Sequence, residues 1–252
     1  MSMPSILVPL PSRDFDPTEV GVPGSHLLEQ GFDLAFATPD GKPAQADPIM
    51  VTGKGLGLLA GALMARRQDI ALYTALIRRP AFLNPVLYHE ARESDFMGLL
   101  LPGGHAKGMR TYLESADLQR LVADFFKAGK PVAAICHGVL LAARSKDSAG
   151  GVSVLHGRKT TGLLKRQEML AWQLTRAWMA DYYRTYGTPM QTEVESFLAA
   201  PGDFIAGPLP LFRDSFQKPE HGFFLKDGNY LSARWPGDAH AFALALPEHF
   251  GG

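Results

Sequence analysis

The sequence contains a single cysteine, Cys136, among its 252 residues. One cysteine excludes a disulfide within the chain, which suits a reducing compartment without requiring one. An excess of either charge is also missing, because Lys+Arg and Asp+Glu both total 25 and the formal net charge is zero. This balance provides no electrostatic reason to expect nucleic acid or an anionic membrane as a partner.

Long apolar runs and targeting signals are missing as well. No apolar run approaches the ~20 residues that a membrane span needs. The first twelve residues lack a basic region and contain Pro4, Pro9 and Pro11, so they do not resemble a secretory signal. The cytoplasm is therefore the location that we expect.

Motifs for a metal ion or a bound cofactor are absent too. No histidine or cysteine spacing follows the His-Glu-x-x-His or Cys-x-x-Cys pattern. The glycine-rich segment at 53–57 is too short for a phosphate-binding loop or a dinucleotide fingerprint. We expect neither a metal site nor a cofactor.

Strand-like and helix-like segments alternate along the chain. Apolar runs typical of buried strands lie at 5–10, 32–38, 96–101 and 131–135. Helix-like stretches lie between them at 16–30 and 115–128. The turn Asp227-Gly228 predicts a hairpin over 223–233, and a final helix begins near 237–240. This order predicts a single α/β domain in which a mostly parallel sheet is covered by helices on both faces.

Two helix-rich segments, at about 50–90 and 165–200, interrupt this order and are interpreted as cap-like insertions. The second contains Trp172, Trp178, Tyr182 and Tyr183. Such aromatic residues more often pack a helix against its neighbours than bind a ligand. We therefore interpret them as contacts of a cap or of a subunit interface.

The segment around Cys136 carries the strongest chemical signal. An apolar strand-like run ends at Cys136-His137-Gly138, and a helix-like apolar run follows at once. This is the strand–turn–helix pattern of a nucleophile elbow, with cysteine in place of serine. The N-terminus of the helix and the adjacent imidazole would both favour the thiolate over the thiol.

Other chemically useful residues follow the neighbouring strands. Glu19 comes after the first strand, and Gly103-Gly104 comes after the strand at 96–101. Because ligands bind beyond the carboxyl ends of parallel strands, we expect these residues to meet Cys136 at one edge of the sheet. Glu19 would act there as a general acid or base, and the glycine and His137 N–H groups would stabilise an oxyanion.

Each of these residues also has a plainer interpretation. A cysteine after a strand is often only a small buried residue, and Pro-Gly-Gly is most often a turn. Glu19 would be favourable in the first turn of a helix through its charge alone. The His-Gly that follows Cys136 favours the chemical interpretation.

These motifs together resemble the ThiJ/PfpI superfamily. The resemblance rests on Glu19, on Phe36-Ala37-Thr38-Pro39-Asp40-Gly41, on Pro102-Gly103-Gly104-His105 and on Ala134-Ile135-Cys136-His137-Gly138. It is most specific over 5–145 and is closest to the branch of heat-inducible chaperones with glyoxalase III activity. It implies a class I glutamine-amidotransferase-like, flavodoxin-like three-layer sandwich with a small helical cap, and it suggests a homodimer.

The resemblance also implies roles for particular residues. Cys136 would be the nucleophile and His137 its neighbour in a triad, while Glu19 would share a proton with the thiol. The third triad acid would be Glu168, six residues beyond Gly162. A glutamine amidotransferase would need a His-x-Glu motif, and none of the eight histidines has a glutamate two positions later.

The resulting hypothesis is a lyase of the glyoxalase III type acting on small 2-oxoaldehydes such as methylglyoxal, without glutathione. Cys136 would form a hemithioacetal, and proton transfer followed by hydrolysis would yield lactate. One alternative is a holdase chaperone or a thiol redox sensor that uses Cys136 for oxidation, with the aromatic segment 172–183 as its client surface. Another is a cysteine-dependent amide or peptide hydrolase, whose open groove a cap over 165–200 would obstruct.

Overall fold

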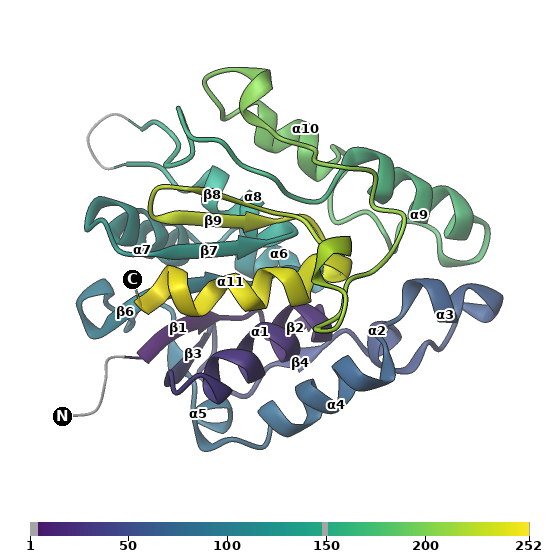
Figure 1. Cartoon of the computed structure of the whole chain (residues 1–252), viewed down its shortest axis with the longest axis horizontal. Coiled ribbons are helices and arrows are strands. Elements are labelled where there is room, and N and C mark those ends of the chain that lie inside the picture. Colours follow the sequence, from purple (N-terminus) through teal and green to yellow (C-terminus); the bar gives the residue numbers. More distant parts are fainter. Residues whose placement is uncertain (1–4, 148–150, 252) are drawn as a thin grey trace.

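A seven-stranded sheet in the order β5-β3-β1-β6-β7-β9-β8 forms the centre of the computed structural model, which describes residues 5–147 and 151–251 (Figure 1). Its strands are β1 (Ser5–Pro9), β3 (Leu34–Thr38), β5 (Val86–Leu87), β6 (Phe96–Leu101), β7 (Val132–Ile135), β8 (Phe224–Asp227) and β9 (Tyr230–Ala233). Only β8 and β9 pair antiparallel among the strands of this sheet. The predicted, mostly parallel sheet is confirmed, and a separate small sheet pairs β2 (Arg13–Phe15) with β4 (Gln45–Ala46).

Helices cover both faces of the central sheet and make the fold a three-layer sandwich. The α-helices are α1 (Pro17–Glu29), α2 (Pro48–Thr52), α3 (Ala60–Leu63), α4 (Arg67–Leu76), α5 (Pro80–Leu83), α6 (Arg110–Leu113), α7 (Ala116–Lys127), α8 (His137–Arg144), α9 (Lys165–Met179), α10 (Met190–Glu195) and α11 (Ala239–Gly251). One layer packs α1 against α4 and α11, and the opposite layer packs α8 against α6 and α7 (Figure 1).

The central strands are apolar along their whole length because both faces of the sheet are covered. In β7, every residue from Val132 to Ile135 is fully buried, and Leu99, Leu100 and Leu101 of β6 are equally inaccessible. A register set by such runs brings the carboxyl ends of β1, β6 and β7 to one edge of the sheet. That edge is where the predicted site residues follow their strands.

The start of α1 is determined by local sequence. The Asp16 side chain caps the helix by accepting hydrogen bonds from the N–H groups of Thr18 (2.8 Å) and Glu19 (3.2 Å). Pro17 occupies the first helical position, where its missing N–H leaves no intrahelical bond unmade. Glu19 is thereby held in the first turn, directly beyond the sheet edge.

The two predicted insertions are only partly a cap. In the first, α4 packs on α1 and β5 joins the central sheet, so this half of the segment belongs to the main layers. The residues before α4 contact the second insertion instead, in a small apolar cluster built around Met50, Leu56 and Tyr183. Trp172 and Tyr182 pack against this cluster, as the aromatic pattern predicted, whereas Trp178 is exposed.

No helix of the described segments is both long enough and apolar enough to span a bilayer.

The packing of α1 on α4 predicts opposite effects of one substitution at two glycines. A Cβ at Gly21 would lie 2.7 Å from the Tyr73 backbone nitrogen, whereas one at Gly61 of α3 would meet nothing within 4 Å. We expect Gly21→Ala to lower the unfolding free energy by about 1 kcal/mol or more, because overpacking outweighs the gain in helix propensity. Gly61→Ala should leave stability unchanged or raise it by up to about 1 kcal/mol.

Thermal unfolding of both variants tests this prediction. For a chain of this size, a loss of 1 kcal/mol corresponds to a fall of about 2–4 °C in Tm. Equal Tm values for the two variants would mean that α1 and α4 are not packed this closely.

Candidate active site

Cys136 lies at the apex of a strained turn between β7 and α8. Its backbone has φ 55° and ψ −125°, a conformation that residues other than glycine rarely adopt. The turn is tight because α8 starts against the end of β6, where a Cβ at Gly138 would lie 2.0 Å from the Leu101 carbonyl oxygen. A strained, non-glycine residue at such a turn is the geometry of a nucleophile elbow, as the sequence predicted.

Gly103 brings Glu19 and the elbow together. Its N–H donates to Glu19 Oε2 at 2.8 Å. A Cβ at this position would lie 2.9 Å from both Glu19 Oε2 and Cys136 Cβ, and 2.6 Å from the His137 nitrogen. The predicted meeting of these residues at the sheet edge is therefore present, but the Gly103 N–H holds the carboxyl group instead of pointing freely at an oxyanion.

Glu19 is fully buried, which favours its protonated form. Burial raises the pKa of its carboxyl group well above the usual value, and the neighbouring Asp16 raises it further. The hydrogen bond from Gly103 and the contact with Cys136 oppose this rise only in part. Within the described structure, Glu19 Oε1 is buried without a hydrogen-bond partner, which makes it the oxygen on which the proton is best placed.

The Cys136 thiol is also held in its neutral form. Burial raises its pKa well above the usual value, and Glu19 and Asp16 raise it further. The His137 N–H at the start of α8 acts in the opposite direction, as the sequence analysis predicted, but it does not prevail. The expected resting thiolate is thus replaced by a thiol that must lose its proton when it reacts.

His137 is oriented as the base for that proton. Its Nδ1 lies 3.4 Å from Cys136 Sγ, and its Nε2 lies 3.2 Å from Thr185 Oγ1. Since the Thr185 hydroxyl donates to the His105 carbonyl oxygen at 2.6 Å, it can only accept from His137. The proton of the neutral imidazole is therefore on Nε2, and the Nδ1 lone pair faces the thiol.

Burial supports this neutral imidazole. It lowers the pKa of His137 to about 3, with a further contribution from His105 and Arg144. Thr185 is itself held in place, because Arg110 donates to its carbonyl oxygen from Nε (2.9 Å) and Nη2 (2.7 Å). Thr185 thus takes the orienting position beside His137 that a carboxylate occupies in many triads.

Glu168 does not take that position. Its Oε2 accepts from the Met190 N–H at 2.9 Å, and its Oε1 lies 3.6 Å from Arg184 Nε. Among the described residues, the polar contacts of the His137 ring are with Cys136 and Thr185. The geometry therefore does not support Glu168 as the third member of a triad, although this residue lines the same pocket.

The thiol faces a pocket of about 240 Å³ between the sheet edge and the cap. Asp16, Glu19, Gly104 and His105 line its base together with Cys136. Burial raises the pKa of Asp16 to about 6, even though it accepts two backbone hydrogen bonds. Its signal in the sequence was its helix-capping position three residues before Glu19.

His105 and Arg213 also line this pocket, and the sequence analysis assigned neither of them to the site. The His105 ring stacks on Tyr183 with centroids 4.4 Å apart, and burial lowers its pKa. Arg213 donates from Nη1 to the Met64 carbonyl oxygen at 2.8 Å, which links the loop before β8 to the first insertion. His105 ends the Pro102-Gly103-Gly104-His105 motif, whereas no local pattern distinguishes Arg213, which only the tertiary fold brings here.

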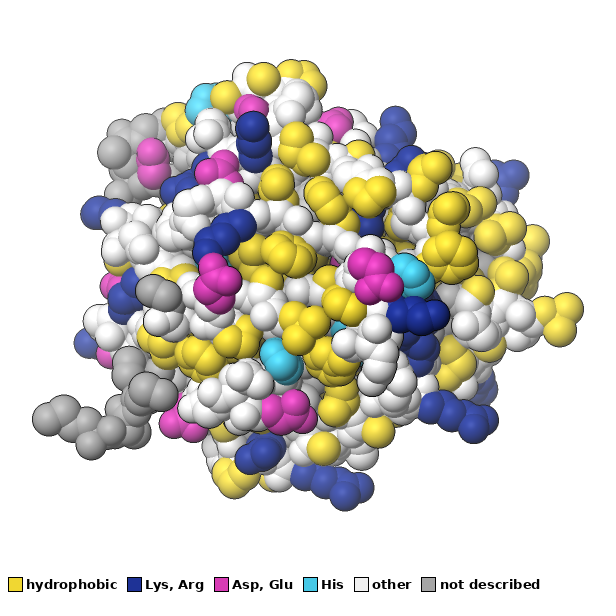
Figure 2. All heavy atoms as spheres, in the orientation of Figure 1, with side chains coloured by type: hydrophobic (Ala, Val, Ile, Leu, Met, Phe, Trp, Pro, Cys, Tyr) yellow, Lys and Arg dark blue, Asp and Glu magenta, His cyan; other side chains and the backbone are white. Residues whose placement is uncertain are grey.

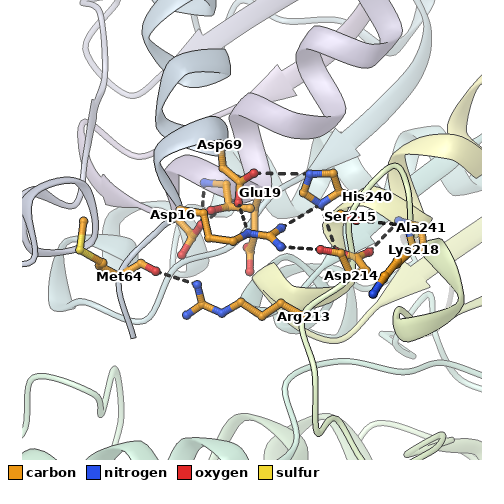
Figure 3. A network of polar contacts seen from close by, with 12 residues as sticks. Asp16, Glu19, Met64, Asp69, Arg213, Asp214, Ser215, Lys218, His240 and Ala241 are labelled. Carbon is orange, nitrogen blue, oxygen red and sulfur yellow. Dashed lines mark hydrogen bonds and ion pairs between the residues drawn. The ribbon is translucent and has the colours of Figure 1, made fainter. Parts of the chain in front are cut away.

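A buried charge network lies beside Glu19 and Asp16 (Figure 3). His240 lies between two carboxylates, with Nδ1 at 3.0 Å from Asp214 Oδ1 and Nε2 at 3.4 Å from Asp69 Oδ1. Burial opposes a positive charge on this ring, but the two carboxylates outweigh it and raise the pKa of His240. This network joins α4, α11 and the loop that carries Arg213.

Within residues 5–147 and 151–251, no group of three or more His, Cys, Asp or Glu side chains is arranged to hold a metal ion.

A sandwich of this kind, with a cysteine at a nucleophile elbow and a buried glutamate beside it, defines a class of cysteine-containing α/β proteins. Residues 10–201 match the family model described as ThiJ/PfpI family-like. The chain belongs to this ThiJ/PfpI-like family, which confirms the resemblance found in the sequence.

Relatives with curated names match part of the chain. Protein/nucleic acid deglycase HchA of Staphylococcus aureus (strain bovine RF122 / ET3-1) is 28% identical over 144 residues, which is 55% of this chain and 46% of the relative. The chain thus matches about half the length of these curated relatives.

Solved structures match over nearly the whole chain. Rapid Encystment Protein 24 kDa of Francisella tularensis has a TM-score of 0.71 at 14% identity, over 98% of this chain and 99% of that structure. Glyoxalase III of Candida albicans has a TM-score of 0.68 at 16% identity, over 99% and 98%. At these identities the similarity establishes the fold alone.

The contacts of Thr185 predict that its hydroxyl group positions His137. Thr185→Val keeps the shape but removes the acceptor for His137 Nε2–H, so the alkylation rate of Cys136 by iodoacetamide should fall about five- to tenfold at neutral pH. Since the chain has one cysteine, alkylation reports on this thiol alone. Thr185→Ser should restore the rate, and an unchanged rate in the valine variant would contradict this role.

The carboxyl group of Glu19 predicts a shift in the pH dependence of the same reaction. Because Glu19 raises the pKa of Cys136, Glu19→Gln should lower it and move the alkylation profile to lower pH by about 1 unit or more. Glu168→Gln is the matched control and should leave the profile in place. If the alkylation profile shifted in Glu168→Gln but not in Glu19→Gln, the result would favour Glu168 as the third member of a triad.

Proposed function

We propose that this chain is a cysteine-dependent enzyme of the glyoxalase III type, which converts 2-oxoaldehydes into 2-hydroxy acids without glutathione. The observation that carries the proposal is the pairing around Cys136. An unprotonated nitrogen of His137 faces the thiol, and the buried carboxyl group of Glu19, whose pKa is raised, lies beside it. A base and an acid at one nucleophile are what the two proton movements of this reaction require.

The first step is addition of the thiol to the aldehyde. Sγ bonds to the aldehyde carbon while His137 Nδ1 accepts the thiol proton, and the product is a hemithioacetal. The N–H groups of Gly104 and His137 stabilise the oxygen that develops negative charge. Glu19 Oε1, which lacks another partner, donates its proton to a substrate oxygen.

The second step is an internal redox shift. A base removes the hydrogen from the former aldehyde carbon as a proton and returns a proton to the neighbouring ketone carbon. The first carbon is oxidised to a thioester and the second is reduced to an alcohol, so no external oxidant or reductant is consumed. Water then hydrolyses the thioester, which releases the hydroxy acid and restores the thiol.

The named relatives support chemistry of this general kind. One similar structure is a glyoxalase III, and the curated relatives are named protein/nucleic acid deglycase. Both names describe enzymes. Activity assays on this chain would decide between the substrates that these two names indicate.

The rival functions fit the site less well. A redox sensor is most sensitive when its cysteine is an exposed thiolate, whereas Cys136 is 4% exposed and its pKa is raised. A peptidase needs an open groove, but α9 and the segment before α4 line the pocket above the thiol. In the holdase hypothesis, the aromatic segment 172–183 would form a client surface, yet Trp172 and Tyr183 of that segment pack within the cap, while Trp178 is exposed.

The proposal predicts lactate formation from methylglyoxal in the absence of glutathione. Cys136→Ala and Glu19→Gln should each reduce turnover at least a hundredfold, because one removes the nucleophile and the other the proton donor. The measurement is an enzymatic lactate assay on protein whose folding is checked by circular dichroism. Absence of turnover by folded wild-type protein that still reacts with iodoacetamide would reject the proposed function.

A further inference from the structure

Besides the groups at its base, the pocket that leads to Cys136 is lined by the polar side chains of Asp69, Gln167, Glu168 and Arg213. Much of the remaining wall is formed by apolar side chains from four separate parts of the chain. They include Met50 and Leu63 from the first insertion, Leu170 and Leu174 from α9, and Pro210 and Trp235 from the loops around β8 and β9. A substrate reaching the thiol must place whatever lies beyond its carbonyl groups against these walls.

The volume of the pocket exceeds what methylglyoxal fills. It measures about 240 Å³, whereas a single water molecule needs about 15 Å³ of such space. The pocket therefore has room for on the order of ten or more water-sized groups, and methylglyoxal is only slightly larger than acetone. Methylglyoxal bound at the thiol would leave most of the apolar wall in contact with water.

Helix α9 directs an apolar stripe at this space. Leu170 and Leu174 are one helical turn apart on the same face, and both line the pocket together with Ala171. Leu170 is nevertheless 56% exposed and Leu174 is 47% exposed, so their apolar surface is not covered by the protein itself. Hydrophobic side chains are also visible on the surface over α3 and α9 (Figure 2).

We infer that the substrates of this site are 2-oxoaldehydes with an extended apolar chain, which lies against α9 while the aldehyde carbon meets Cys136. This inference rests on the proposed function and specifies its substrate class. Each methylene group removed from water adds about fourfold to binding in the transition state. A butyl substituent in place of methyl adds three methylene groups and should therefore raise kcat/KM by up to about 60-fold.

A homologous series of straight-chain substrates tests this inference. Methylglyoxal, 2-oxobutanal, 2-oxohexanal and 2-oxooctanal share the reacting carbonyl groups, so differences between them report on the chain. We expect kcat/KM of the wild-type protein to rise from methylglyoxal to 2-oxohexanal. In the double variant Leu170→Asn/Leu174→Asn, the ratio of kcat/KM for 2-oxohexanal to that for methylglyoxal should fall at least tenfold.

Leu244→Asn is the matched control. Leu244 is 43% exposed on α11 and does not line the pocket, so the same substitution there should leave the ratio unchanged. Turnover that is flat or falls with chain length would overturn the inference and leave the proposed function standing. An unchanged ratio in the double variant would also overturn it, whereas no turnover of any substrate would reject the proposed function and this inference with it.

Discussion

The close approach of the elbow to the end of β6 is the constraint on which the site depends. A Cβ at Gly138 would meet the Leu101 carbonyl oxygen at 2.0 Å, and one at Gly103 would meet the His137 nitrogen at 2.6 Å. Two positions without side chains therefore let α8 begin directly against the neighbouring strand. The sulfur, the imidazole and the carboxyl group of Glu19 share one small space for this reason.

Burial shifts the pKa of the groups in that space. It raises the pKa of Glu19 and of Cys136 well above their usual values, and Glu19 raises that of Cys136 further. Both shifts favour the neutral form. His137 is neutral as well, and its tautomer follows from the single proton of the Thr185 hydroxyl. Asp16, whose pKa is raised to about 6, and Arg213 line the same pocket. The raised pKa of the thiol makes it less prone to indiscriminate oxidation.

The cap gives this chemistry its shape. Segments that are far apart in sequence meet in the cluster of Met50, Leu56 and Tyr183, and the pocket lies between that cluster and the sheet edge. The same second insertion supplies Thr185 to the imidazole and the leucine stripe to the pocket. The hydroxyl group that orients His137 and the leucine side chains that we propose to select among substrates thus come from one segment that is not part of the central sandwich.

Local sequence determined the sheet, the elbow and the helix that carries Glu19, because apolar strands, the Cys136-His137-Gly138 turn and the Asp16 cap act through neighbouring residues. The edge at which these parts meet was also predictable, since parallel strands end on the same side. Three features could not be predicted in this way. Thr185 and not Glu168 contacts His137, the Gly103 N–H binds Glu19, and the pKa of the thiol is raised. They depend on which loop packs beside His137 and how completely it excludes water, and only the tertiary structure decides such long-range contacts.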